Sequence, residues 1–182
     1  MWSGATWNAR RSKGFTLVEL LIVIAILGII AGIIIPLMLD GIHRAKQKRT
    51  IGDMRNVGSC WMSWLTDQAS AAAAGTPLRT YDFTDALSVE LDARELLSTL
   101  YVNQTFFYCS EVPPNDAWGH QFEYRWSGNS LAAQVVGIRS GGRDGSFDRN
   151  AYPIGAFTTT DYNVDIVWAD GYFVAYPSGS VN

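Results

Sequence analysis

The sequence contains few of the residues that most enzyme active sites use. Only two histidines, His43 and His120, and two cysteines, Cys60 and Cys109, occur among its 182 residues. No serine–histidine–aspartate arrangement, phosphate-binding glycine loop or metal-hydrolase spacing accompanies the histidines. The spacing of the cysteines matches neither a CxxC redox motif nor a zinc site. The sequence therefore gives no support to a catalytic function.

The two cysteines leave two arrangements open. If the part of the chain that carries them lies outside the cytoplasm, Cys60 and Cys109 can form one disulfide, because oxidising compartments allow disulfides to persist. Two buried free thiols account for these residues equally well, since cysteine is often buried as a small apolar side chain.

Clustered positive charge is also missing. The 14 Lys and Arg are outnumbered by 17 Asp and Glu, and the formal net charge is −3. Proteins that bind nucleic acid gather Lys and Arg along one groove-sized face, which this sequence does not do. We therefore expect no nucleic-acid partner.

Charge is almost absent from one long segment near the N-terminus. From Phe15 to Leu39 the only formally charged residue is Glu19. As a helix, this segment would extend for ~37 Å, which is enough to cross a hydrocarbon core of ~30 Å. A secretory signal peptide has a shorter apolar core followed by a small-x-small cleavage site, and the residues leading to Pro36 offer none. We expect the segment to be retained as a transmembrane helix.

The charges near this segment do not determine its orientation. Basic residues precede it at Arg10, Arg11 and Lys13, and a further basic cluster follows it closely, so the positive-inside rule is undecided. A carboxylate such as Glu19 costs ~2.5–3.5 kcal/mol at the centre of a bilayer. Its side chain therefore either reaches the headgroups or has a polar or cationic partner.

Beyond Pro36 the apolar residues, among them Ile51 and Met54, recur near helical spacing. Four alanines at 71–74 and a following Gly-Thr-Pro sequence end the pattern. We predict one helix of roughly 55–60 residues whose second half packs on a globular head. Residues 84–101 fit a second helix.

In the C-terminal part the apolar period changes from helical to two, which is typical of strands. Strands are predicted at 122–126 and 131–138, and 165–176 fits a hairpin closed by Asp170-Gly171. The expected fold class is therefore α+β, with a long N-terminal helix, membrane-spanning in its first half, packed on a small antiparallel sheet.

A Gly- and Asp-rich loop lies between the predicted strands. It contains Asp144 and Asp148, and Asp161 and Asp165 follow. Carboxylates in a flexible backbone suit Ca²⁺, which binds six to eight oxygens, although the EF-hand spacing is absent. A polar surface loop whose aspartates form turns is the alternative interpretation.

The start of the apolar segment resembles the signature shared by type IV pilins and the pseudopilins of type II secretion. The resemblance rests on Gly14, Phe15, Glu19 and Pro36, in that register. It implies that prepilin peptidase cuts after Gly14 and methylates Phe15. It implies that Glu19 pairs with the free amine of a neighbouring subunit during assembly, and that Pro36 bends the helix.

The C-terminal half looks like that of major pseudopilins. The similar segments are 116–124, 140–145 and the dipeptide Asp165-Ile166. In that family the loop binds calcium, and the matching ligands here are Asp144 and Asp165. This chain has a longer loop and carries Val164, not an acidic residue, before Asp165, so that Asp148 or Asp161 is expected to substitute.

The resemblance implies an organisation into a leader (1–14), a filament-core helix (15–39), an amphipathic helix (40–75) and a head (76–182). It also implies a single-pass protein of the bacterial inner membrane, with a cytoplasmic leader and a periplasmic head, that later enters a filament. Expected partners are copies of itself, other pseudopilins or pilins, prepilin peptidase and an inner-membrane assembly platform.

The function implied is that of a structural subunit of a type II secretion pseudopilus that drives protein export, with calcium as cofactor. The Asp-rich loop and the absence of a C-terminal cysteine pair favour this function over the alternative, a type IV pilus subunit for adhesion, motility or DNA uptake. A membrane-anchored enzyme or sensor is the remaining class, against which the scarcity of catalytic residues argues.

Overall fold

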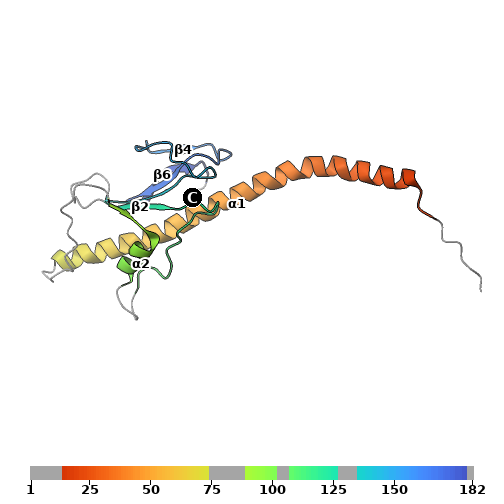
Figure 1. The fold of residues 1–182 in the computed structure, drawn as a ribbon. Helices are drawn as coiled ribbons and strands as arrows, with labels where there is room; N and C mark the ends of the chain where they lie inside the picture. The colour runs from red at the N-terminus through yellow and green to blue at the C-terminus, as the bar shows by residue number, and fades with distance from the viewer. Residues whose placement is uncertain (1–13, 74–88, 102–106, 127–134, 180–182) are drawn as a thin grey trace, which may run out of the picture. The chain divides into compact units, whose positions relative to one another are not determined.

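The structure, a computed structural model, describes residues 14–73, 89–101, 107–126 and 135–179 (Figure 1). Its longest element is α1 (Leu17–Ala73), a helix of 57 residues. The chain divides after Asp40 into two units, Met1–Asp40 and Gly41–Asn182. The helix matches the predicted length of roughly 55–60 residues.

The first unit consists of the apolar part of α1. Its large side chains are all exposed, from 46% at Val23 to 80% at Leu17. Among the described residues, α1 is the one helix long and apolar enough to cross a membrane, with a mean hydropathy of 3.1 over its most apolar window. The helix continues through Pro36, although proline cannot donate the hydrogen bond to the preceding turn. So much exposed apolar surface requires lipid or other helices around it.

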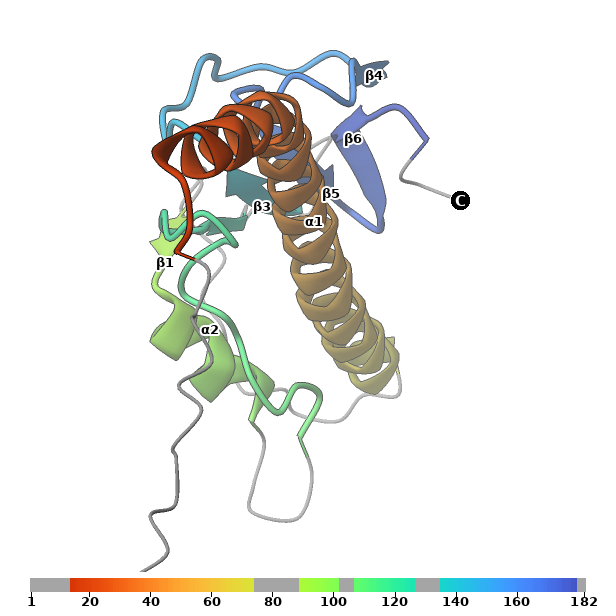
Figure 2. The same cartoon turned by 90° about the vertical axis from the view of Figure 1, so that its right-hand side faces the viewer.

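The second unit is a six-stranded sheet packed on the remainder of α1, with a short second helix beside it (Figure 2). The strand order is β1-β2-β3-β5-β6-β4. Neighbouring strands are antiparallel, except that β4 runs parallel to β6. The bounds are β1 (Val89–Leu91), α2 (Ala93–Leu100), β2 (Glu123–Trp126), β3 (Val136–Ser140), β4 (Gly155–Phe157), β5 (Ile166–Ala169) and β6 (Tyr172–Pro177).

The core lies between α1 and one face of the sheet. Trp61 and Met54 of α1 are buried together with Tyr124 of β2 and Trp168 of β5. The sheet approaches α1 closely at Gly58, where an added Cβ would stand 2.4 Å from the Trp168 ring. The absence of a side chain at this helix position therefore allows the indole to lie against the α1 backbone.

The predicted second helix is too long. Its expected start at residue 84 lies outside the described residues, and Val89–Leu91 forms β1, an edge strand paired with β2. Helix α2 begins only after Asp92, where the Glu95 carboxylate accepts the Asp92 N–H at 3.2 Å. This capping interaction starts the helix inside the apolar pattern that had suggested a longer one.

The predicted α+β fold is confirmed, as is the hairpin of β5 and β6. Its turn uses positive φ at Asp170 (47°) and Gly171 (100°), which suits an Asp-Gly pair. Strand β3 extends to Ser140, and the predicted start of that strand at 131 lies outside the described residues. Strand β4, parallel to β6, was not predicted, because three residues are too few to show a period of two.

Candidate functional site

The N-terminal end of α1 is closed by a capping box. Leu20 donates its N–H to the Thr16 carbonyl at 3.3 Å. The Glu19 carboxylate oxygen Oε2 accepts the Thr16 N–H at 2.9 Å and the Thr16 hydroxyl at 2.8 Å, and the Glu19 N–H bonds Thr16 Oγ1 at 3.2 Å. The T-x-x-E spacing of Thr16 and Glu19 is the sequence signal of this capping box, which was not among the predictions.

Gly14 and Phe15 precede the helix and belong to no helix or strand. Both are exposed, and the Phe15 side chain is 72% accessible. The peptide bond between them therefore lies outside the hydrogen-bonded helix, where a protease can reach it. The structure places Pro36, the fourth residue of the predicted N-terminal signature, within the apolar part of α1.

In the head, the buried carboxylate of Asp116 holds the turn at Trp118-Gly119 against the end of β3. Asp116 Oδ1 accepts the N–H groups of Trp118 and His120, both at 2.9 Å, and Oδ2 accepts the Ser140 hydroxyl at 2.7 Å. Ala117 donates its N–H to Thr50 on α1 at 3.2 Å. Asp116 thus positions the Gly- and Asp-rich loop that begins at Ser140, a role that its sequence position alone did not reveal.

Close backbone approaches shape the beginning of this loop. Gly142 has φ of 65°, and a Cβ there would lie 2.6 Å from the Tyr162 carbonyl oxygen. The same carbonyl accepts the Arg143 N–H at 2.7 Å. Gly145, with φ of 69°, lies against the His120 ring, whose Nε2 is 3.1 Å from the Arg143 carbonyl oxygen. Glycine is required at both positions, so the loop has one defined path.

The four predicted metal ligands are not gathered into one cluster. Asp144 accepts the Ser146 N–H at 3.1 Å and Asp161 accepts the Asn163 N–H at 3.4 Å, each forming a local turn. The part of the chain that the structure describes contains no group of three or more His, Cys, Asp or Glu side chains placed to hold a metal ion. Turn formation, the alternative interpretation of these aspartates, therefore describes two of them.

Asp165 differs from the other three because it is only 1% exposed. Its Oδ2 accepts the Asp148 N–H at 3.0 Å and the Tyr152 hydroxyl, whereas Oδ1 is buried without a hydrogen-bond partner among the described residues. Burial raises the pKa of Asp165, and its hydrogen bonds with Tyr152 and Asp148 offset this only in part. A buried carboxylate oxygen without a partner is the feature of this loop that suits a cation.

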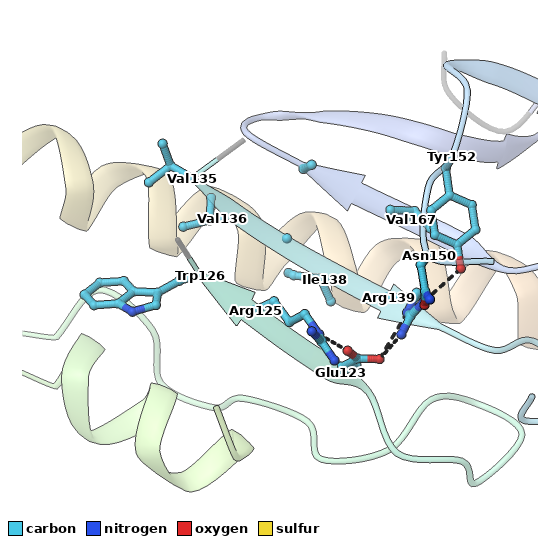
Figure 3. A pocket seen from close by; sticks show the side chains of 12 residues that line it. Glu123, Arg125, Trp126, Val135, Val136, Ile138, Arg139, Asn150, Tyr152 and Val167 are labelled. Atoms are coloured by element: carbon cyan, nitrogen blue, oxygen red, sulfur yellow. Dashed lines mark hydrogen bonds and ion pairs between the residues drawn. The ribbon is translucent and has the colours of Figure 1, made fainter. Parts of the chain in front are cut away.

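Charged side chains from two strands meet on the sheet face opposite the core (Figure 3). Buried Glu123 forms ion pairs with Arg125 and Arg139. Arg139 also donates to the Tyr152 hydroxyl at 3.1 Å and stands 3.8 Å above the Phe147 ring. Glu123, Arg125, Arg139 and Tyr152 line an open cavity of about 300 Å³. Through Tyr152 the network connects the sheet to Asp165, so the loop is anchored at both ends.

The two cysteines meet in the core. Cys60 lies on α1 and Cys109 in the segment that follows α2, and the two thiols are close enough to interact. Both are thiols in this structure. The Cys109 thiol also donates to the Glu111 carbonyl at 3.0 Å.

Comparison with known proteins agrees with the N-terminal signature. Residues 9–35 match the family described as the prokaryotic N-terminal methylation motif. The type II secretion system core protein G of Vibrio cholerae is 24% identical over 159 residues, which cover 84% of this chain and 97% of that protein. No solved structure gives a significant match.

Fimbrial proteins are more similar over a shorter length. The type IV major fimbrial protein FimA of Dichelobacter nodosus is 39% identical over 77 residues, and a fimbrial protein of Pseudomonas aeruginosa is 34% identical over 84 residues. The chain spans about half the length of each, 49% and 54% respectively. The similarity to core protein G therefore includes the head, while neither fimbrial alignment covers the whole chain.

Proposed function

Because this chain belongs to the type IV pilin and pseudopilin family, whose members are structural subunits rather than enzymes, we propose that it is a subunit of a type II secretion pseudopilus. The observation that carries this proposal is the alignment with core protein G along nearly the full length of both chains. The Asp-rich loop of the head, held by Asp116 and by the two glycines, supports it further.

Processing is the first step of the proposed mechanism. Prepilin peptidase cuts the exposed bond between Gly14 and Phe15 and methylates the new N-terminus. The cut leaves the capping box intact, because Thr16 and Glu19 both lie on the retained side. The mature chain therefore begins one residue before the cap of its helix.

Assembly is the second step. The apolar part of α1 holds the precursor in the bacterial inner membrane, with the leader in the cytoplasm and the head in the periplasm. An inner-membrane assembly platform then moves the subunit into a filament of identical chains and other pseudopilins. In the filament, Glu19 pairs with the α-amino group of a neighbour. Both Thr16 bonds use Oε2, so that Oε1 is available for this second partner.

Calcium is the proposed cofactor of the head. Asp165 fits a cation because its buried Oδ1 lacks a partner, and Asp148 is beside it through the hydrogen bond of its N–H. Asp144 and Asp161 do not share this position, since their carboxylates form local turns. The ion would supply positive charge to a buried carboxylate and would hold the loop closed.

A type IV pilus subunit is the second candidate function. The higher identity of the fimbrial relatives, 39% and 34%, favours it over the part of the chain that they cover. Both functions use the same N-terminal helix. They differ in the activity of the filament, which is protein export for a pseudopilus and adhesion, motility or DNA uptake for a pilus.

Deletion of the gene in its host, followed by two assays, tests the proposal. We expect the deletion strain to lose release of exported proteins into the medium while keeping surface pili and surface motility, and the intact gene to restore release. Loss of pili with unchanged protein release would overturn the proposal in favour of the pilus.

A further inference from the structure

The two cysteines of the chain, Cys60 and Cys109, come from segments far apart in the sequence and are placed side by side in the head. Cys109 is 3% exposed, and Cys60 packs against the same core. The two thiols are close enough to interact. They are the two cysteines of the chain. A disulfide forms only between cysteines whose side chains are already close to each other.

The neighbouring residue fixes this placement independently. Tyr108 donates its hydroxyl to Asp67 at 2.7 Å, and Asp67 lies two helical turns beyond Cys60 on α1. The Tyr108 N–H bonds the Leu100 carbonyl at the end of α2, at 3.0 Å. The segment around Cys109 is therefore held between α1 and α2 by bonds that do not involve sulfur.

A metal site and a redox catalyst explain the pair less well. No third His, Cys, Asp or Glu completes a metal site with these thiols among the described residues. Burial, together with the interaction with Cys109, raises the pKa of Cys60 to about 12. Catalytic thiols have a lowered pKa, because the thiolate is the nucleophile.

We propose that Cys60 and Cys109 form a disulfide in the mature protein, which joins α1 covalently to the segment after α2. Formation of this disulfide in the cell rests on the proposed function, which places the head outside the cytoplasm. Each thiol loses one proton and one electron as the S–S bond forms. The disulfide of an exported thiol–disulfide oxidoreductase, or of oxidised glutathione, accepts both electrons and both protons and becomes two thiols.

The bond forms while the head folds. In the unfolded chain a cysteine has a pKa of ~8.5, so a useful fraction is thiolate. In the folded head both burial and the raised pKa of Cys60 oppose attack on an external disulfide. Folding in an oxidising compartment therefore leads to the bridge, and the closed core then protects it from reduction.

The bridge closes a loop that contains the end of α1, β1 and α2. Such a closure restricts the unfolded chain and stabilises the folded head. It also keeps the α2 segment attached to the helix through which the subunit is drawn out of the membrane. Subunits would then enter the filament with this side of the head already closed.

Refolding of the full chain in detergent tests the proposal. The chain is reduced and unfolded, then refolded in a glutathione mixture poised like an oxidising compartment. Free thiols are then labelled with a maleimide in denaturant, so that buried thiols react as well. We expect most molecules to carry no label until reductant is added, and two labels afterwards. The Cys60→Ser variant, as control, should carry one label in both conditions. Two labelled thiols in the refolded wild-type chain would overturn the proposal.

Timing and the proposed function are tested separately. Folded, reduced chain should form the bridge at least tenfold more slowly than refolding chain; equal rates would contradict formation during folding.

Chain from host membranes is then labelled and weighed. Free thiols in chain that has lost residues 1–14 would overturn the bridge. A retained leader would instead contradict the proposed function, while refolding decides the bridge.

Discussion

Glu19 is satisfied within its own chain before any neighbour arrives. Thr16 donates both its N–H and its hydroxyl to the carboxylate, which also places a negative charge at the positive end of the α1 dipole. A carboxylate held in this way is less costly in the bilayer than a bare one. The residue is therefore expected to matter for contacts between subunits more than for membrane insertion.

The Glu19→Ala substitution should separate these two steps. The variant should insert into the membrane normally. Loss of a charge-assisted bond worth ~1.5–3 kcal/mol should weaken each subunit contact roughly 10- to 100-fold. The measurement is the ratio of filament to membrane-bound subunit after shearing. Glu111→Ala, which removes an exposed carboxylate from the head, is the matched control. Normal filament yield from Glu19→Ala would rule out the ion pair.

Asp165 gives the head a pH dependence with a definite sign. Because burial raises its pKa, the folded state binds this proton more tightly than the unfolded chain does. Its stabilising contribution is complete below the ordinary aspartate pKa of ~3.9 and is lost as the pH rises through the folded-state value. Above the folded-state pKa the head contains a buried negative charge, which a bound cation would offset.

Asp165→Asn should remove both the pH dependence and the response to calcium. Wild-type chain in detergent should gain about 2.7 kcal/mol of unfolding free energy when free calcium is 100 times its Kd. The variant, which has no charge to offset, should gain nothing, while Glu111→Gln should keep the full gain. Calcium titrations followed by thermal unfolding measure this. An undiminished gain in Asp165→Asn would show that calcium, if bound, uses other residues.

At the scale of elements, the junction of α1 with the sheet depends on one glycine. Gly58 lets the buried Trp168 ring lie against the helix, whereas Gly52, on the same helix, has nothing within 4 Å of an added Cβ. Both glycines are helical, but the Trp168 ring lies against Gly58 and no atom lies near the Cβ position of Gly52. They therefore form a matched pair for measuring the packing of this junction.

Gly52→Ala should stabilise the head by up to ~1 kcal/mol, because alanine is the better helix former. Gly58→Ala receives the same helical gain but forces the Trp168 ring to move. Overpacking a core typically costs ~1–3 kcal/mol, so Gly58→Ala should rank below Gly52→Ala by about that amount. Chemical unfolding of both variants in detergent gives the difference. Equal stabilities would mean that the indole moves without cost.

At the scale of the whole molecule, the two units differ in where their apolar side chains are buried. The second unit buries its apolar side chains between α1 and the sheet. The first unit exposes nearly all of its own and needs lipid or other helices. One chain thus combines a head that has its own core with a helix whose core is supplied by the membrane or by other subunits.

The mass of the protein from its host membrane tests this organisation directly. We expect a chain that lacks residues 1–14 and carries one added methyl group on Phe15, because the processing site is exposed and lies outside the helix. Intact-protein mass spectrometry measures both changes together. A full-length, unmethylated chain would leave only a membrane-anchored head of another function.

Local patterns in the sequence were enough to predict several features. Helical spacing and the alanine run predicted the length of α1, and Asp170-Gly171 predicted the hairpin. The Gly14–Glu19 signature predicted the family, because its spacing is read along a single helix start. Each of these depends on neighbours in sequence, whose geometry the backbone determines directly.

Only the tertiary structure decided which side chains meet across the head. Contacts between distant segments bring Cys60 close to Cys109 and place β4 beside β6. They also bury Asp165 away from Asp144 and Asp161. From the sequence, the aspartates and the cysteines could be identified, but the residues that they contact in the folded head could not. Burial and pairing are properties of the packed chain, because they arise only when the sheet closes over α1.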